Sequence, residues 1–181
     1  MAKKALILID IQNEYFENGV LELVNPIPAS KNAGKLLERF REQNFPVVHI
    51  QHISPAGAPF FIEGTKAAEI HENVKPKEGE KVFAKQFPNS FRDTGLLEYL
   101  RSNNITELVI VGMMTHMCID ATTRAAFDYG FSCTVIGDAC ATMDLEIKGE
   151  KVKAIDVHNA NLAALEFFYA KIQHAEEYLS A

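Results

Sequence analysis

The chain has 181 residues, 48% of them apolar, and a formal net charge of −6. This size and composition predict one domain, residues 1–181, that buries a substantial core. The negative charge and the lack of clustered Lys and Arg argue against a nucleic-acid-binding surface, because neutralising phosphates requires such clusters. A small-molecule substrate is the expected partner.

The first apolar run spans only residues 5–9 and stops at Asp10. It is too short for a signal peptide or a membrane span, so we expect a cytoplasmic protein without membrane contact. Cys118, Cys133 and Cys140 form no C-x-x-C pair, and three cysteines in a reducing compartment predict free thiols. We expect Cys133 and Cys140 to be buried structural residues.

The first third of the chain predicts a strand, a helix and a second strand. Residues 4–10 are an apolar run closed by a carboxylate, typical of a strand buried on both faces of a parallel sheet, which places Asp10 at a strand's carboxyl end. Ser30 is expected to cap a helix over residues 30–44, whose apolar positions recur at helical spacing. Residues 46–52 are the next predicted strand, reached by a right-handed crossover.

The middle of the chain predicts a long loop and a third strand. Residues 54–79 show no dominant period, and a loop of this length in a compact domain is usually functional. Residues 81–85 predict a strand with Lys85 at its end. Asp93 or Thr94 is expected to cap the short helix that follows.

The most informative stretch joins a predicted strand to a predicted helix. Residues 107–111 are β-formers that reach Gly112, and residues 119–129 are expected to be helical, so Cys118 falls near the first helical turn. Unpaired backbone N–H groups and the positive end of the helix dipole favour a thiolate there. The same donors could hold an oxyanion formed when the thiolate attacks a carbonyl.

The last part of the chain predicts a fifth strand over residues 132–138, a helix over residues 149–166 and a sixth, edge strand within residues 167–172. Gly130 should end the preceding helix. Strands that alternate with helices predict the α/β class, here a three-layer α/β/α sandwich around a mostly parallel, Rossmann-like sheet of about six strands. In such sheets, ligands bind beyond the carboxyl ends of the strands.

Three chemically complementary side chains, Asp10, Lys85 and Cys118, follow such strand ends. A protonated Lys85 beside Cys118 would lower the thiol pKa, and Asp10 could take the thiol proton and pass it to a leaving group. The thiolate would attack a carbonyl, an amine would leave, and water activated by Asp10 would hydrolyse the thioester. The residues therefore predict a hydrolase.

The same residues match the motifs of a known family. Asp10-Ile11-Gln12-Asn13 follows the first strand, Lys85 follows the third, and residues 112–118 read Gly-Met-Met-Thr-His-Met-Cys, which looks like a G-x-x-T-x-x-C signature. In this order the chain resembles the isochorismatase-like cysteine hydrolases, which include nicotinamidases, N-carbamoylsarcosine amidase and isochorismatase. The resemblance implies their fold, a catalytic triad of Asp10, Lys85 and Cys118, and a homodimer.

Expectations about the pocket accompany this resemblance. By similarity, the peptide bond between Met113 and Met114 should be cis, and the N–H groups of Met114 and Cys118 should hold the oxyanion. The residues expected to contact the substrate are Gln12, Phe16, His52, Phe87, Thr115 and His116. Four phenylalanines from irregular segments predict either an apolar pocket wall or a subunit contact, and these are Phe60, Phe61, Phe87 and Phe91.

Two departures from the family pattern bear on the reaction. Nicotinamidases carry an Asp-x-His metal site after the second strand, whereas this chain has His52 and Ser54 at those positions, so we expect no metal and no cofactor. Isochorismatases proper generally lack the cysteine, so Cys118 favours hydrolysis of a C–N bond. The alternatives are a metal-dependent nicotinamidase, an isochorismatase-type hydrolase, and a non-catalytic small-molecule-binding or assembly subunit on the same scaffold.

Overall fold

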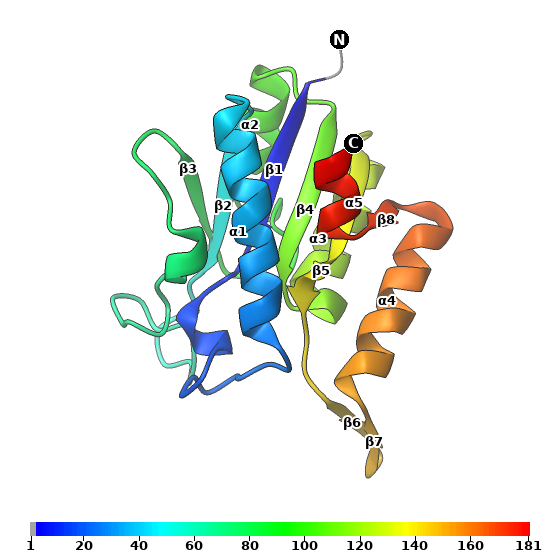
Figure 1. Cartoon of the computed structure of the whole chain (residues 1–181). Coiled ribbons are helices and arrows are strands. Elements are labelled where there is room, and N and C mark those ends of the chain that lie inside the picture. Colours follow the sequence, from blue (N-terminus) through cyan, green and yellow to red (C-terminus); the bar gives the residue numbers. More distant parts are fainter. Residues whose placement is uncertain (1–2) are drawn as a thin grey trace.

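A six-stranded parallel sheet forms the centre of the structure, a computed structural model that describes residues 3–181. Across the sheet, the strands lie in the order β3 (Lys81–Lys85), β2 (Val47–His52), β1 (Lys4–Ile9), β4 (Glu107–Met113), β5 (Ser132–Ala141) and β8 (Lys171–Gln173) (Figure 1). The chain moves outward from β1 to β3 and then returns to β4 on the other side of β1. The boundary between β1 and β4 is therefore the topological switch point, where open α/β sheets bind ligands.

Helices cover both faces of this sheet, which confirms the predicted three-layer sandwich. The helices α1 (Pro26–Glu42) and α5 (Ala175–Ser180) lie on one face, in front of the sheet in Figure 1. The helices α2 (Leu96–Ser102), α3 (Asp120–Asp128) and α4 (Ala154–Phe168) pack on the other. Alternate residues of β1 supply the two cores, because side chains of a strand point to opposite faces.

The helix α1 begins earlier than predicted. Pro26 occupies its first turn, where the missing N–H costs nothing, and Asn25 before it has a positive φ of 55°. Ser30 lies inside the helix and donates its hydroxyl to the Ile27 carbonyl, 3.0 Å away, so the prediction that it caps the helix is wrong.

The predicted helix over residues 149–166 is shifted by a hairpin. The strands β6 (Leu145–Ile147) and β7 (Glu150–Val152) are antiparallel, and the two residues between them, Lys148 and Gly149, both have positive φ, as a tight hairpin turn requires. The helix α4 starts only at Ala154, whose N–H donates to the Asp144 carboxylate at 2.8 Å.

Other boundaries also differ. The helix α2 has Gly95 at its N-cap rather than Asp93 or Thr94, although the Thr94 hydroxyl accepts a bond from the Leu96 N–H at 3.3 Å. The predicted edge strand shrinks to the three residues of β8, because α4 extends to Phe168. The long segment after β2 is irregular as expected, apart from the short 3₁₀ helix Glu72–Val74.

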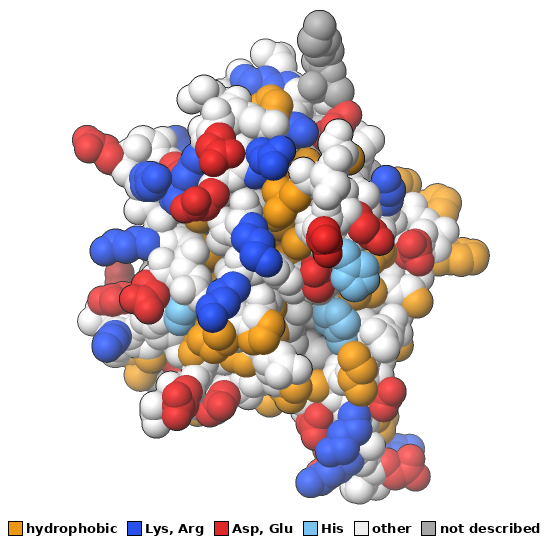
Figure 2. Space-filling view, in the orientation of Figure 1, with side chains coloured by type: hydrophobic (Ala, Val, Ile, Leu, Met, Phe, Trp, Pro, Cys, Tyr) orange, Lys and Arg blue, Asp and Glu red, His pale blue; other side chains and the backbone are white. Residues whose placement is uncertain are grey.

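Large hydrophobic side chains are exposed on α4. Figure 2 shows hydrophobic side chains projecting at the edge of the molecule where the helix ends. Phe167 is 90% exposed, and Ile155 and Phe168 are also exposed. Within residues 3–181, no helix has the length and hydrophobicity needed to cross a membrane.

A cluster of charged and polar side chains, Arg41, His49 and Glu80, connects α1 and β2 to the residue just before the edge strand β3. The Glu80 carboxylate accepts hydrogen bonds from Arg41 at 2.6 and 2.9 Å and lies 2.9 Å from Nε2 of the buried His49. Burial opposes ionisation of Glu80, but the bonds from Arg41, the Lys77 N–H and His49 outweigh it and lower the pKa of Glu80 to about 2.

We predict that Glu80→Gln destabilises the fold in a pH-dependent way. Because the pKa is about 2 in the folded chain and near 4.5 when unperturbed, the contribution of Glu80 is complete above the unperturbed value and is lost as the pH falls towards 2. Urea unfolding should show a deficit on the order of 2 kcal/mol at pH 7 that narrows at pH 3. The exposed Glu78→Gln is the control, and an equal deficit for Glu80→Gln at both pH values would contradict this assignment.

Candidate active site

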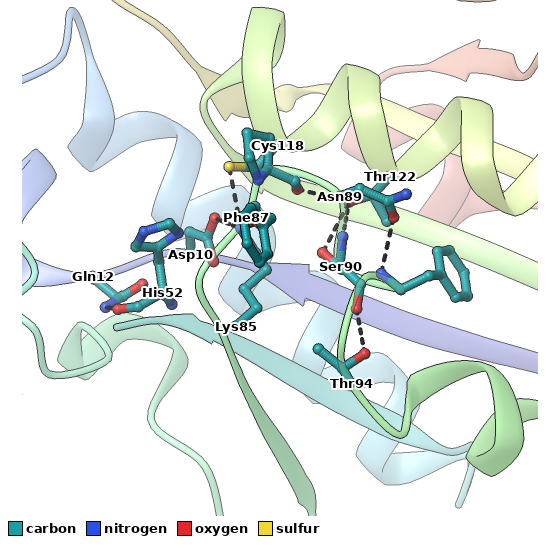
Figure 3. A network of polar contacts seen from close by, with 12 residues as sticks. Asp10, Gln12, His52, Lys85, Phe87, Asn89, Ser90, Thr94, Cys118 and Thr122 are labelled. Carbon is teal, nitrogen blue, oxygen red and sulfur yellow. Dashed lines mark hydrogen bonds and ion pairs between the residues drawn. The ribbon is translucent and has the colours of Figure 1, made fainter. Parts of the chain in front are cut away.

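Asp10, Lys85 and Cys118 converge at the switch point (Figure 3). The Lys85 Nζ lies 2.7 Å from Asp10 Oδ2 and 3.2 Å from Cys118 Sγ. It also donates to the Phe87 carbonyl at 3.0 Å. A lysine ammonium has three N–H donors, so all of them have a partner here. The three side chains are buried, with Cys118 only 5% exposed.

The backbone at the ends of β1 and β4 brings these groups together. Asp10 has a positive φ of 51°, which turns the chain directly after β1. Ile9 is paired with Gly112 of β4, and a Cβ atom at Gly112 would lie 2.0 Å from the Ile9 carbonyl oxygen. Only glycine permits this close approach, because Gly112 also has a φ of 133°.

The nucleophile turn, defined as residues 113–119, connects β4 to α3. The peptide bond between Met113 and Met114 is cis. A π-helical turn over Thr115–Ile119 follows and leads directly into α3, so Cys118 lies just before this α-helix rather than in its first turn. The Met114 carbonyl accepts bonds from the N–H groups of Met117 and Ile119 at 3.1 and 3.2 Å. The turn is therefore closed by its own backbone.

Burial changes the expected charge of Cys118. Burial and then the Asp10 carboxylate raise the pKa of the thiol, and Lys85 only partly opposes them. Lys85 thus lowers the thiol pKa as predicted, but burial and Asp10 outweigh it, so the expected thiolate is not favoured at this position. Burial lowers the pKa of Lys85, but the charge of Asp10 and the hydrogen bonds to Asp10 and Cys118 outweigh it, so the net pKa is raised and the ammonium is retained.

One oxygen of Asp10 is uncommitted. Both carboxylate oxygens are buried without a hydrogen-bond partner among residues 3–181, but Oδ2 forms the ion pair with Lys85, which leaves Oδ1 with neither. A buried polar atom without a partner is costly and usually marks a functional demand. The site therefore holds a neutral thiol, an ammonium and a carboxylate oxygen that is free to accept a proton.

Gln12 fastens two loops beside this centre. Its Nε2 donates to the carbonyls of His52 and Ala68 at 2.8 and 2.7 Å, and its Oε1 accepts from the His52 N–H at 2.7 Å. Both amide N–H groups are thus committed to backbone. The structure gives Gln12 a supporting position, because it ties the end of β2 and the long loop to the segment after Asp10.

Aromatic side chains pack together in the loops beside His52. The ring of Phe61 lies 5.2 Å from that of His52 and 5.1 Å from that of Tyr15. Phe16 stacks on His71 at 3.8 Å. Burial lowers the pKa of His52, and its neutral ring therefore adds no charge beside Asp10. Phe61 is thus buried among the loops next to the site, whereas Phe91 packs in the core beneath α2 and α3.

Two buried anchors that hold the loops are not predicted from the sequence. The buried Glu14 carboxylate accepts the N–H groups of Val20 and Phe61, both at 2.9 Å, and so joins the loop after β1 to the long loop. Ser90, in the loop after β3, bonds to Thr122 of α3 through its N–H at 3.0 Å and its hydroxyl at 2.8 Å (Figure 3). Neither residue belongs to a pattern that predicts such a role.

The remaining expected substrate residues bond to neighbouring protein groups. The Phe87 carbonyl accepts a hydrogen bond from Lys85, and the Phe87 ring lies 3.5 Å from the Arg92 guanidinium. Thr115 and His116 bond to the end of β5 and to α4. Among residues 3–181, no group of three or more His, Cys, Asp or Glu side chains is arranged to hold a metal ion.

We predict that Lys85→Met costs more stability than removing both charges. The single change leaves the buried Asp10 without its cation, which should cost about 3 to 5 kcal/mol. The double variant Asp10→Asn, Lys85→Met should recover at least half of that loss, measured by urea unfolding at pH 7. Equal losses in the single and double variants would show that the ion pair is not what holds these residues.

Comparisons with known proteins place this site in a family. The isochorismatase domain model matches residues 4–166. The chain is 49% identical over 176 residues to the uncharacterised isochorismatase family protein YddQ of Bacillus subtilis, covering 97% of this chain and 98% of that one. It is 29% identical to maleamate amidohydrolase of Pseudomonas putida, covering 94% and 82%.

A solved structure agrees with these sequence matches. The crystal structure of an isochorismatase from Pseudomonas putida superposes with a TM-score of 0.92 at 33% identity, covering 97% of this chain and 91% of that one. The match spans the sheet, the nucleophile turn and the loops that surround them. The chain belongs to the isochorismatase family of hydrolases.

Proposed function

We propose that this protein is a cysteine hydrolase that cleaves a C–N bond of a small amide through a thioester on Cys118. The observation that carries the proposal is the buried Lys85 ammonium, which lies 2.7 Å from Asp10 and 3.2 Å from Cys118. A nucleophile, a proton acceptor and a fixed cation within contact distance are what acyl transfer to sulfur requires. The name of the related maleamate amidohydrolase supports an amide as the substrate.

Attack and proton transfer occur together in this proposal. The raised pKa of Cys118 means that a free thiolate is not the resting species. As sulfur attacks the carbonyl carbon, Oδ1 of Asp10 takes the thiol proton, and the retained charge of Lys85 offsets the negative charge that moves to the substrate. The N–H groups of Met114 and Cys118 would hold the oxyanion, as the family resemblance implies.

The tetrahedral intermediate then breaks down to a thioester, which water hydrolyses. The protonated Asp10 gives its proton to the leaving nitrogen, the C–N bond breaks, and an amine or ammonia departs, which leaves the acyl group on sulfur. Asp10, again a carboxylate, deprotonates the attacking water. The C–S bond breaks, the carboxylic acid product leaves, and the proton on Asp10 returns to Cys118. No metal or redox step is needed.

We predict that Cys118→Ala abolishes turnover whereas Cys133→Ala does not. Both changes remove a buried thiol, but Cys133 lies within β5, far along the strand from the site. Ammonia release over a panel of small carboxamides and N-carbamoyl compounds should fall by about 10⁴-fold or more in Cys118→Ala. Activity should stay within about threefold of the parent in Cys133→Ala. Turnover that survives in Cys118→Ala would remove the proposed function.

We predict that Asp10→Asn makes Cys118 more acidic and yet inactive. Loss of the neighbouring negative charge, with Lys85 still in place, should lower the thiol pKa, whereas loss of the proton acceptor should stop catalysis. Thiolate absorbance near 240 nm, corrected by the matching Cys118→Ala variants, should show titration at lower pH in Asp10→Asn than in the parent. The reverse order would mean that Asp10 does not act on this thiol.

We also propose that two copies associate through α4. Ile155, near the start of α4, and Phe167 and Phe168, at its end, are large apolar side chains that are exposed on this helix. In a two-fold antiparallel pair of α4 helices, the end that carries Phe167 in each copy would lie near the end that carries Ile155 in the other, as a self-complementary interface requires. Phe167 is 90% and Phe168 64% exposed, and association through this end of α4 would remove both rings from water.

We predict that Phe167→Asp gives a monomer. A carboxylate buried in the pair would have no partner, so dissociation should rise by at least about 30-fold. Sedimentation velocity at 1 to 50 μM should show a dimer for the parent and for the control Val20→Asp, which changes another exposed apolar residue. A parent that stays monomeric over this range would contradict the proposed contact.

A further inference from the structure

One side chain of α4 bonds directly to the nucleophile turn. His158 Nδ1 lies 2.9 Å from the Thr115 hydroxyl oxygen, and this hydroxyl lies 3.3 Å from the Ala141 carbonyl at the end of β5. A hydroxyl has a single proton, and a carbonyl can only accept. Both contacts are satisfied only when Thr115 donates to Ala141 and accepts from His158. We therefore assign the proton of His158 to Nδ1, the tautomer that satisfies both contacts.

The state of His158 suits this bond. Burial lowers the pKa of the ring, so it stays neutral, and with Nδ1 protonated its Nε2 carries no proton. The ring borders a cavity of about 310 Å³ between the first turns of α1 and α4 and the end of β5. Asp10, Lys85 and Cys118 do not line this cavity. His158 is therefore placed to act on the turn and not on a reacting group.

The bond reaches the part of the turn where alignment matters most. Thr115 follows Met114, the expected oxyanion donor, and comes three residues before Cys118. The next residue makes a parallel tie, because His116 Nδ1 lies 2.6 Å from the hydroxyl of Thr142. Thr115 and His116 are thus bonded to Ala141, the last residue of β5, and to Thr142, which follows it. His158 bonds to the same Thr115 hydroxyl.

We propose that His158 is a positioning residue. Through Thr115 it holds the nucleophile turn, so that the Met114 N–H and Cys118 Sγ keep their alignment with Asp10 and Lys85. This inference rests on the proposed function. Loss of alignment weakens the transition state more than substrate binding, and a misplacement of about 1 Å costs on the order of 100-fold in rate. The rate constant kcat should therefore change far more than KM.

A matched pair of variants separates the hydrogen bond from the volume of the ring. In His158→Asn the amide N–H occupies the place of Nδ1–H, whereas His158→Leu keeps bulk and loses the donor. We expect kcat to fall by about 10- to 100-fold in His158→Leu, with KM within about threefold, and to stay within about threefold of the parent in His158→Asn. Equal rates in the two variants, whether both normal or both low, would overturn the proposal.

Two further readouts show whether His158 acts through Thr115 and whether the reaction itself is wrongly assigned. Thr115→Val, which removes the hydroxyl, should lower kcat as much as His158→Leu does, and the double variant should be no slower than either single one. Losses that multiply in the double variant would show that His158 does not act through Thr115.

The alkylation of Cys118 by iodoacetamide can be measured without any substrate. Its rate should change in His158→Leu and not in His158→Asn. Turnover that persists in Cys118→Ala would instead reject the proposed function, and alkylation rates that stay unchanged would reject the role of His158.

Discussion

The buried ammonium of Lys85 is the constraint on which the rest of this site depends. A charge removed from water is tolerated only when it is paired and hydrogen-bonded, and Lys85 meets this demand with Asp10, Cys118 and the Phe87 carbonyl. Lys85 belongs to the edge strand β3, whereas Asp10 follows β1 with β2 between them. Two strand spacings amount to about 10 Å. Only a long side chain that leans across the end of β2 bridges that distance.

The surrounding loops hold the end of β2, which the Lys85 side chain crosses to contact Asp10. β2 ends at His52, opposite Lys85, and Gln12 binds both backbone groups of His52, which fixes the edge that the lysine must cross. Glu14 joins the loops that close over His52, and Ser90 bonds the loop after β3 to α3. Water is thereby kept away from the ion pair. The same burial raises the pKa of Cys118, so one structural cause protects the charges and keeps the thiol neutral.

The sequence predicts the sheet and the placement of the three central residues well, for a definite physical reason. Parallel strands buried on both faces are continuous apolar runs, and a charged residue directly after such a run must lie at the ligand-binding edge. Asp10 and Lys85 are found in this way, and the glycine at position 112 marks where β4 approaches β1. These signals are local along the chain.

The features that the sequence does not predict depend on how deeply side chains are buried and on contacts between residues far apart in the chain. The pKa of Cys118 is raised because burial of the thiol outweighs the nearby Lys85 cation. How deeply a side chain is buried cannot be read from the sequence around it. The start of α4 was misplaced because Lys148 and Gly149 form a hairpin turn within a stretch that also fits a helix. His158 and Thr115 are 43 residues apart and meet only after α4 has packed on the nucleophile turn.

In the proposed mechanism, Cys118 carries the acyl group between two chemical steps. The most direct test is rapid acid quenching of a single turnover on an amide that the protein hydrolyses, followed by peptide mass spectrometry. We expect an adduct of the acyl mass on the peptide containing Cys118, which rises and then decays as the carboxylic acid appears. Complete release of the amine with no adduct on Cys118 at any quench time would contradict it.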